Sequence, residues 1–100
     1  MNKESINPEY KQAVIKAIEY HFPNAKIVLF GSRAKGTNKP GADIDIAIDD
    51  NRQIKLRELA RARITLENLS IPLEVDLVDI QEIPQELKDI IREEGIVWKN

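Results

Sequence analysis

Three aspartates and one glycine-serine turn are the residues of this chain whose types and spacing could do chemistry. Gly31 and Ser32 follow an apolar run, and Asp43 and Asp45 come ten residues later, separated by one isoleucine. Asp76 lies inside a later apolar run. A turn that can approach a phosphate, with carboxylates beside it, is the arrangement needed to hold a nucleoside triphosphate and its metal ions.

The aspartates at positions 43 and 45 are spaced to point the same way. Strand side chains alternate between two faces, so residues i and i+2 share one face. Two carboxylates that close repel each other unless a cation neutralises them, and carboxylate oxygens suit Mg²⁺ or Mn²⁺. The alternative is a strand edge whose polar face lies in water. Asp76 favours the metal site, because a lone aspartate in the apolar run 73–78 needs a partner. Glu74 is expected to be solvated.

The turn at Gly31-Ser32 predicts contact with an anion. Glycine lets the backbone approach a ligand closely, and amides that open a helical turn attract anions. The Ser32 hydroxyl adds a donor. Arg33 and Lys35 either pair with phosphates or are solvated loop charges; the sequence leaves both interpretations open.

Other phosphate and metal motifs are absent. A P-loop needs lysine after its second glycine, but Thr37 follows Gly36. An EF-hand loop beginning at Asp43 would place Ala47 at position 5 and Ile48 at position 6, where an oxygen ligand and a glycine are required. The single histidine, His21, is predicted to be a surface or helix-end residue.

The elements that must position these residues follow the order α-β-loop-β-α-β-α-β. The helix before the third strand is long enough for a right-handed crossover, which makes the second and third strands parallel neighbours. Asp76 then lies beside Asp43 and Asp45 on one face of the sheet. The first two strands are expected to be antiparallel, which gives a mixed sheet. Apolar periodicity and turn signals predict helices over 8–22, 52–69 and 83–94, strands over 27–30, 43–48, 73–78 and 96–98, and a mobile loop over 37–41.

Composition limits the classes of protein further. One hundred residues predict a single domain over 1–100, and a net charge of −2 argues against a sequence-independent nucleic-acid binder. Without cysteine there are no disulfides or thiolate metal sites. The start has no apolar signal region, and no apolar run reaches the ~20 residues that span a bilayer. We therefore expect a cytoplasmic protein without direct nucleic-acid or membrane contact.

The combination of these features is more specific than any one of them. Gly31-Ser32, ten residues, Asp43-x-Asp45 and a later Asp76 resemble the signature of the polymerase beta-like nucleotidyltransferase superfamily. Within it, the short chain resembles the minimal nucleotidyltransferases (MNT) of HEPN/MNT toxin–antitoxin pairs, over nearly its whole length. The resemblance implies an α/β (α+β) fold, a small mixed sheet flanked by helices.

The resemblance also implies a role for each residue. Asp43 and Asp45 would bridge two divalent ions, Mg²⁺ or alternatively Mn²⁺, and Asp76 would bind the catalytic ion and help activate the attacking hydroxyl. Gly31 and Ser32, with Arg33, would hold the phosphates of the nucleotide.

The implied reaction is transfer of a nucleoside monophosphate, AMP from ATP, to a hydroxyl acceptor. The acceptor would be a tyrosine of a partner HEPN toxin, so the chain would act as the antitoxin within a hetero-oligomer. Two alternatives stay open: an antitoxin that neutralises its partner by binding alone, and a Mg-nucleotide-binding module without transfer activity.

Overall fold

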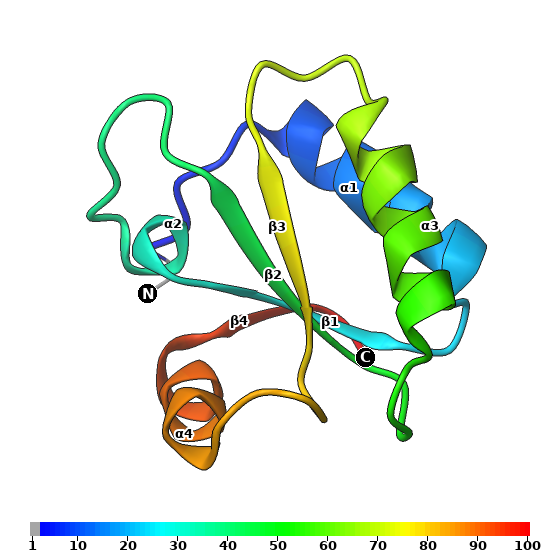
Figure 1. The fold of residues 1–100 in the computed structure, drawn as a ribbon. Helices are drawn as coiled ribbons and strands as arrows, with labels where there is room; N and C mark the ends of the chain where they lie inside the picture. The colour runs from blue at the N-terminus through cyan, green and yellow to red at the C-terminus, as the bar shows by residue number, and fades with distance from the viewer. Residues whose placement is uncertain (1–2) are drawn as a thin grey trace.

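Residues 3–100, which the computed structural model describes, form a four-stranded sheet with helices on both faces (Figure 1). The sheet is mixed, and the predicted α/β fold class is confirmed. The elements are, in chain order, α1 (Pro8–His21), β1 (Lys26–Phe30), α2 (Ser32–Lys35), β2 (Ile44–Asp49), α3 (Leu56–Glu67), β3 (Val75–Asp79), α4 (Gln85–Glu94) and β4 (Ile96–Lys99).

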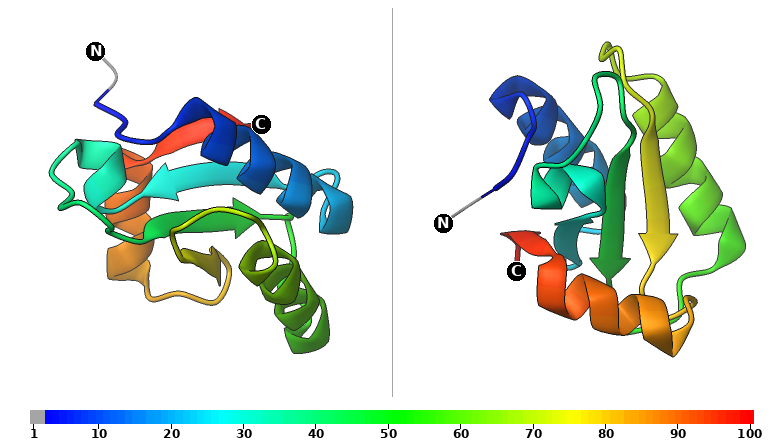
Figure 2. Two further views of the ribbon diagram at one scale, coloured as in Figure 1. Left: turned by 90° about the horizontal axis from the view of Figure 1, so that it is seen from above. Right: turned by 90° about the vertical axis from the view of Figure 1, so that its left-hand side faces the viewer.

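The strand order β3-β2-β1-β4 explains how distant residues meet. β1 is antiparallel to both of its neighbours, whereas β2 and β3 run parallel, as the right-hand view of Figure 2 shows. α3 makes the crossover between β2 and β3, as predicted from its length. The parallel pair places residues 44–48 of β2 directly opposite residues 75–79 of β3.

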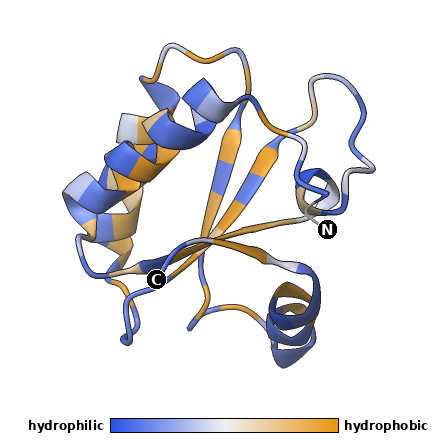
Figure 3. Ribbon diagram, turned by 180° about the vertical axis from the view of Figure 1, so that it is seen from behind, coloured by the Kyte–Doolittle hydropathy of each residue, from blue (hydrophilic) through white to orange (hydrophobic). Residues whose placement is uncertain are grey.

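The two faces of the sheet carry different cores. Ile44, Ile46 and Ile48 are fully buried on the face covered by α1 and α3. Ala47 points the other way and packs with Ile91 of α4, which lies on the opposite side of the sheet (Figure 1). The alternation of apolar and polar residues along the strands is visible in Figure 3. The predicted alternation of β2 is therefore confirmed.

Several predicted boundaries were wrong by one to four residues. β2 begins at Ile44 rather than at position 43, and β3 begins at Val75 rather than at position 73. The helix predicted over 52–69 spans only Leu56–Glu67. The chain before it stays outside the helix because the Ile54 amide donates to the buried Asp79 carboxylate at 2.8 Å. Local propensity cannot show such a contact between segments.

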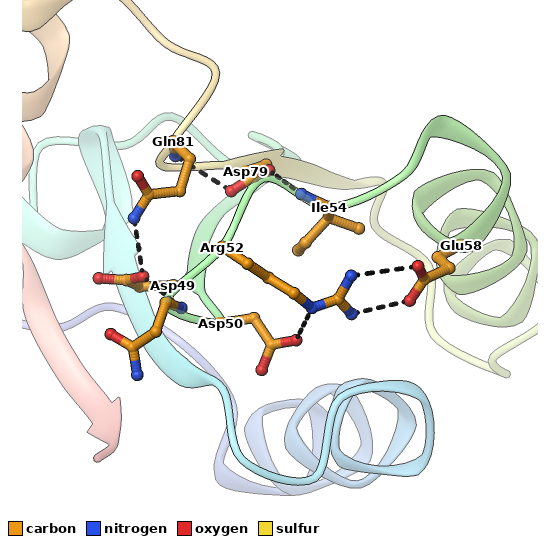
Figure 4. Close-up of polar contacts among 8 residues, drawn as sticks. Asp49, Asp50, Arg52, Ile54, Glu58, Asp79 and Gln81 are labelled. Carbon is orange, nitrogen blue, oxygen red and sulfur yellow. Dashed lines mark hydrogen bonds and ion pairs between the residues drawn. The ribbon is translucent and has the colours of Figure 1, made fainter.

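Asp79 accepts hydrogen bonds from the chain segments that leave the sheet where β2 and β3 end (Figure 4). The Asp79 carboxylate accepts from the backbone amides of Ile54 and Gln81, and Asp79 is 2% exposed. Nearby, Arg52 donates to both Asp50 and Glu58 near the surface. No helix within residues 3–100 is long and apolar enough to cross a membrane.

We predict that Asp79→Ala lowers the free energy of unfolding by about 2 kcal/mol, because two amides lose their acceptor and one of them is buried. Asp50→Ala, which removes an acceptor near the surface, should cost less than about 1 kcal/mol. Urea denaturation followed by circular dichroism measures both. Equal losses in the two variants would contradict the role given to Asp79.

Candidate active site

The parallel pairing of β2 and β3 sets Asp45 directly opposite Asp76. On its other side Asp45 is opposite Phe30, the last residue of β1, which Gly31 follows. Asp45 therefore lies between Asp76 and the glycine turn, on adjacent strands of one sheet. Asp43 precedes β2 by one residue.

Asp45 and Asp76 lie on the face of the sheet that carries α4, and Asp43, which directly precedes β2, is close enough for its charge to act on Asp45. Residues opposite each other across a sheet share a face, and Asp45 alternates with the buried Ile44 and Ile46. α4 packs over Ala47, farther along β2, and does not bury the acids. Asp45 is half-buried, whereas Asp43 and Asp76 are exposed. The site is thus open to solvent at one end of this face.

The electrostatics show that the acids influence one another. The pKa of Asp45 is raised above its ordinary value, first because burial disfavours its charged form and then because the charges of Asp76 and Asp43 repel it. A cation placed among these carboxylates would remove that repulsion.

The donor set fits a hard divalent cation, since all three groups offer carboxylate oxygens. Within residues 3–100, no three acid or histidine side chains are already gathered at ligand distances. Like charges keep such groups apart, and exposed aspartate side chains have the rotamer freedom to converge on an ion. The chemistry of the residues therefore fits the ion, while its binding remains a prediction.

Gly31 is required by its conformation and by its neighbour. Its φ of 76° and ψ of −159° lie in a region that is essentially restricted to glycine. A Cβ at this position would also overlap the Oδ2 atom of Asp45. The turn backbone therefore lies against the Asp45 carboxylate, and α2 begins at once with Ser32, so that its first amides lack intrahelical partners.

Arg33 and Lys35 have partners in the protein. Arg33 is 7% exposed, and its guanidinium donates to the backbone carbonyls of Ala42 and Ser5, each at 2.9 Å. Lys35 lies 3.2 Å from Glu94 in an exposed ion pair. Contact of Arg33 with a nucleotide remains a prediction, but two of its donors are already in use. The carbonyls that it binds are far away in the sequence, so no local pattern could have revealed them.

His21 is the last residue of α1, as predicted, and its Nε2 atom lies 2.7 Å from the Thr65 hydroxyl. It therefore links the ends of two helices and takes no part in the candidate site.

The chain is similar to known proteins over most of its length. A family model described as polymerase beta, nucleotidyltransferase matches residues 12–100. The chain belongs to this family. Its predicted nucleotidyltransferase class is thereby confirmed.

Individual relatives agree with the family. The probable protein adenylyltransferase MntA of Haemophilus influenzae is 29% identical over 86 residues, which cover 85% of this chain and 75% of the relative. A crystal structure of a toxin–antitoxin with AMP-PNP is 26% identical, with a TM-score of 0.77 over 90% of this chain and 73% of that one. A nucleotidyltransferase structure from Sulfolobus solfataricus, 22% identical, shares the fold with a TM-score of 0.53 over 90% of this chain and 77% of that one.

We predict that Gly31→Ala lowers the free energy of unfolding by about 2–3 kcal/mol, because the new Cβ adds overlap with Asp45 to the backbone strain. Gly41→Ala is the matched control, since Gly41 has a similar φ of 80° but no neighbouring atom within 4 Å of the place that a Cβ would occupy. Thermal melts of both variants give the difference due to the Asp45 contact. Equal losses would show that strain alone matters at position 31.

We predict that Asp45→Asn raises the melting temperature of the metal-free protein at pH 7. Because the folded pKa is raised, the folded state binds protons more tightly than the unfolded chain, so stability falls as pH rises from about 3.8 through the folded pKa. Asparagine does not ionise, so the variant does not lose this stability as the pH rises. Its advantage should therefore shrink as the pH is lowered toward 3.8 in a series of melts. An advantage independent of pH would show that the charge of Asp45, disfavoured by burial and by its acidic neighbours, is not its cause.

Proposed function

We propose that this chain transfers AMP from ATP to a hydroxyl of a partner toxin and thereby acts as an antitoxin. The observation that carries the proposal is the pairing of Asp45 with Asp76 across parallel strands, next to Gly31, in a chain of the polymerase beta nucleotidyltransferase family. This pairing brings residues from two separate strands side by side on one face of the sheet.

The relatives support the donor and the kind of partner. The Haemophilus influenzae relative is named a protein adenylyltransferase, which makes AMP the group transferred and a protein the acceptor. The toxin–antitoxin structure at 26% identity contains AMP-PNP, and a mutant MntA–HpeT toxin–antitoxin structure, also 26% identical, has a TM-score of 0.76 over 96% of this chain and 75% of that one. The resemblance to MNT proteins makes the partner a HEPN-family helical toxin and a tyrosine the acceptor. We place the reaction in the cytoplasm.

Asp43, Asp45 and Asp76 would hold Mg²⁺, in two sites, with Mn²⁺ as a substitute. Divalent ions held there would neutralise the triphosphate and would stabilise both the attacking and the leaving oxygens of an in-line displacement. The pKa of Asp45 is raised first by burial and then by the charges of Asp76 and Asp43, and it is these charges that such ions would balance.

The chain's own groups then position the reactants. The backbone at Gly31 and the Ser32 hydroxyl would hold the β- and γ-phosphates, and Asp76 would help activate the attacking hydroxyl. The acceptor hydroxyl would give up its proton with the help of the Asp76 carboxylate, its oxygen forms a bond to the α-phosphorus, the bond from that phosphorus to the bridging oxygen breaks, and pyrophosphate leaves. Most of the rate enhancement comes from positioning and charge stabilisation.

The test is incubation of the chain and its purified HEPN partner with Mg²⁺ and ATP labelled at the α-phosphate. We expect label on the partner, and Asp43→Ala plus Asp45→Ala should lower transfer by at least about 100-fold. ATP labelled at the γ-phosphate should give no labelled partner. Asp50→Ala, an aspartate at the other end of β2, is the control that keeps activity.

The other outcomes identify the alternatives. An inhibited but unlabelled partner would mean that binding alone neutralises it. A partner neither labelled nor inhibited, with ATP still bound, would leave a Mg-nucleotide-binding module. Size-exclusion chromatography of the double variant shows whether loss of label reflects loss of the complex.

A further inference from the structure

Asp43 is the one predicted metal ligand that the sheet does not hold. β2 begins at Ile44, so the backbone of Asp43 lies outside the strand ladder. The segment before it is a loop in which Gly41 has a φ of 80° and open space around it, with a turn closed by the Ala42 amide donating to the Lys39 carbonyl at 3.1 Å. The position of Asp43 therefore depends on what fixes this loop.

The Arg33 side chain makes a long-range contact with the residue before Asp43. Its Nε atom donates to the Ala42 carbonyl and its Nη1 atom to the Ser5 carbonyl, each at 2.9 Å. The Ser5 amide in turn donates to the Arg33 carbonyl at 2.8 Å. A single buried side chain thus joins α2, the N-terminal segment and the loop that delivers Asp43.

Burying the charged guanidinium of Arg33 costs free energy, and packing alone would not require a charged residue at this position. A charged group removed from water needs compensation, and among residues 3–100 no carboxylate forms an ion pair with this guanidinium. The acceptors that compensate it are the two backbone carbonyls. The planar fork of arginine can reach two carbonyls in fixed directions, which the single ammonium of lysine cannot reproduce.

We propose that Arg33 is a positioning residue, which holds Asp43 ready for the metal through the Ala42 carbonyl, and is not a phosphate ligand. The proposal rests on the proposed function only in taking Asp43 as a metal ligand. It replaces the sequence-based expectation that the charge of Arg33 faces the nucleotide.

Arg63 offers a matched comparison within the same chain. It is also partly buried, and its Nε and Nη2 atoms donate to the Leu77 carbonyl at 3.2 and 2.8 Å. Leu77 follows Asp76, but it lies in the middle of β3, where the ladder to β2 fixes the backbone on its own. Loss of Arg63 should therefore cost stability without displacing a metal ligand.

The test is titration of the metal-free, nucleotide-free chain with Mn²⁺, with free Mn²⁺ measured by electron paramagnetic resonance. Arg33→Met should weaken Mn²⁺ binding by about 10-fold, as loss of a group that orients a ligand usually does. Arg33→Lys, the milder variant, should also weaken it, and Arg63→Met should change it by less than about 2-fold. Hydrogen exchange at the Ala42 amide, which donates to the Lys39 carbonyl in the same loop, should quicken only in the Arg33 variants.

Each other result overturns the inference. Unchanged Mn²⁺ affinity with weaker ATP binding would make Arg33 a phosphate ligand. Equal Mn²⁺ losses for Arg33→Met and Arg63→Met, or unfolding of both Arg33 variants, would make it a general structural residue. If the wild type binds no Mn²⁺, or binds it equally after Asp43→Ala, the assignment of Asp43 fails instead, which is a separate failure of the proposed metal site.

Discussion

The parallel pairing of β2 with β3 is the constraint on which the candidate site depends, because it sets two carboxylates directly opposite each other on the same face. No property of Asp45 or Asp76 alone would bring them together. The pairing is driven from the other face, where Ile44, Ile46 and Leu77 are buried under α1 and α3. The apolar core on the face covered by α1 and α3 thus stabilises the strand pairing, although the aspartates on the opposite face repel one another.

That division explains why the site residues violate ordinary folding preferences. Asp45 is half-buried beside two like charges, Gly31 adopts a conformation that other residues avoid, and Arg33 is buried with no carboxylate of residues 3–100 in an ion pair with it. Burial of the Asp45 and Arg33 charges costs stability in the metal-free chain, and position 31 admits no other residue without strain. Together they lie at one end of β2, whereas the other end is stabilised by Asp79 and its amide donors. Such constrained positions, gathered in one place next to a well-satisfied polar network, are typical of a functional site.

The sequence predicted the order of the elements, the mixed sheet and the face of β2, because those follow from local periodicity and from the length of the crossover helix. It also predicted that Asp76 would lie beside Asp45, which needs only the parallel pairing. Boundaries were less accurate at α3, where a contact from Asp79 on β3 holds residue 54 outside the helix. The hydrogen-bond partners of Arg33 could not be predicted for the same reason, since Ser5 and Ala42 lie 28 and 9 residues away from it in the sequence. Apolar periodicity and secondary-structure propensity describe residues that are close along the chain, and they do not reveal contacts between distant segments.

The exposure of the acids bears on how specificity arises. Asp43 and Asp76 are exposed, and α4 covers only the adjoining part of the same face. Electrostatic stabilisation of a transferred phosphoryl group is strongest where water is excluded. The open surface around these aspartates does not exclude water without a second molecule bound to it. An acceptor that is itself a folded protein would close the site as it docks, so that the transferable group is enclosed only when the correct hydroxyl is present. The open geometry therefore favours a macromolecular acceptor over a small molecule, in agreement with a partner that is modified while bound.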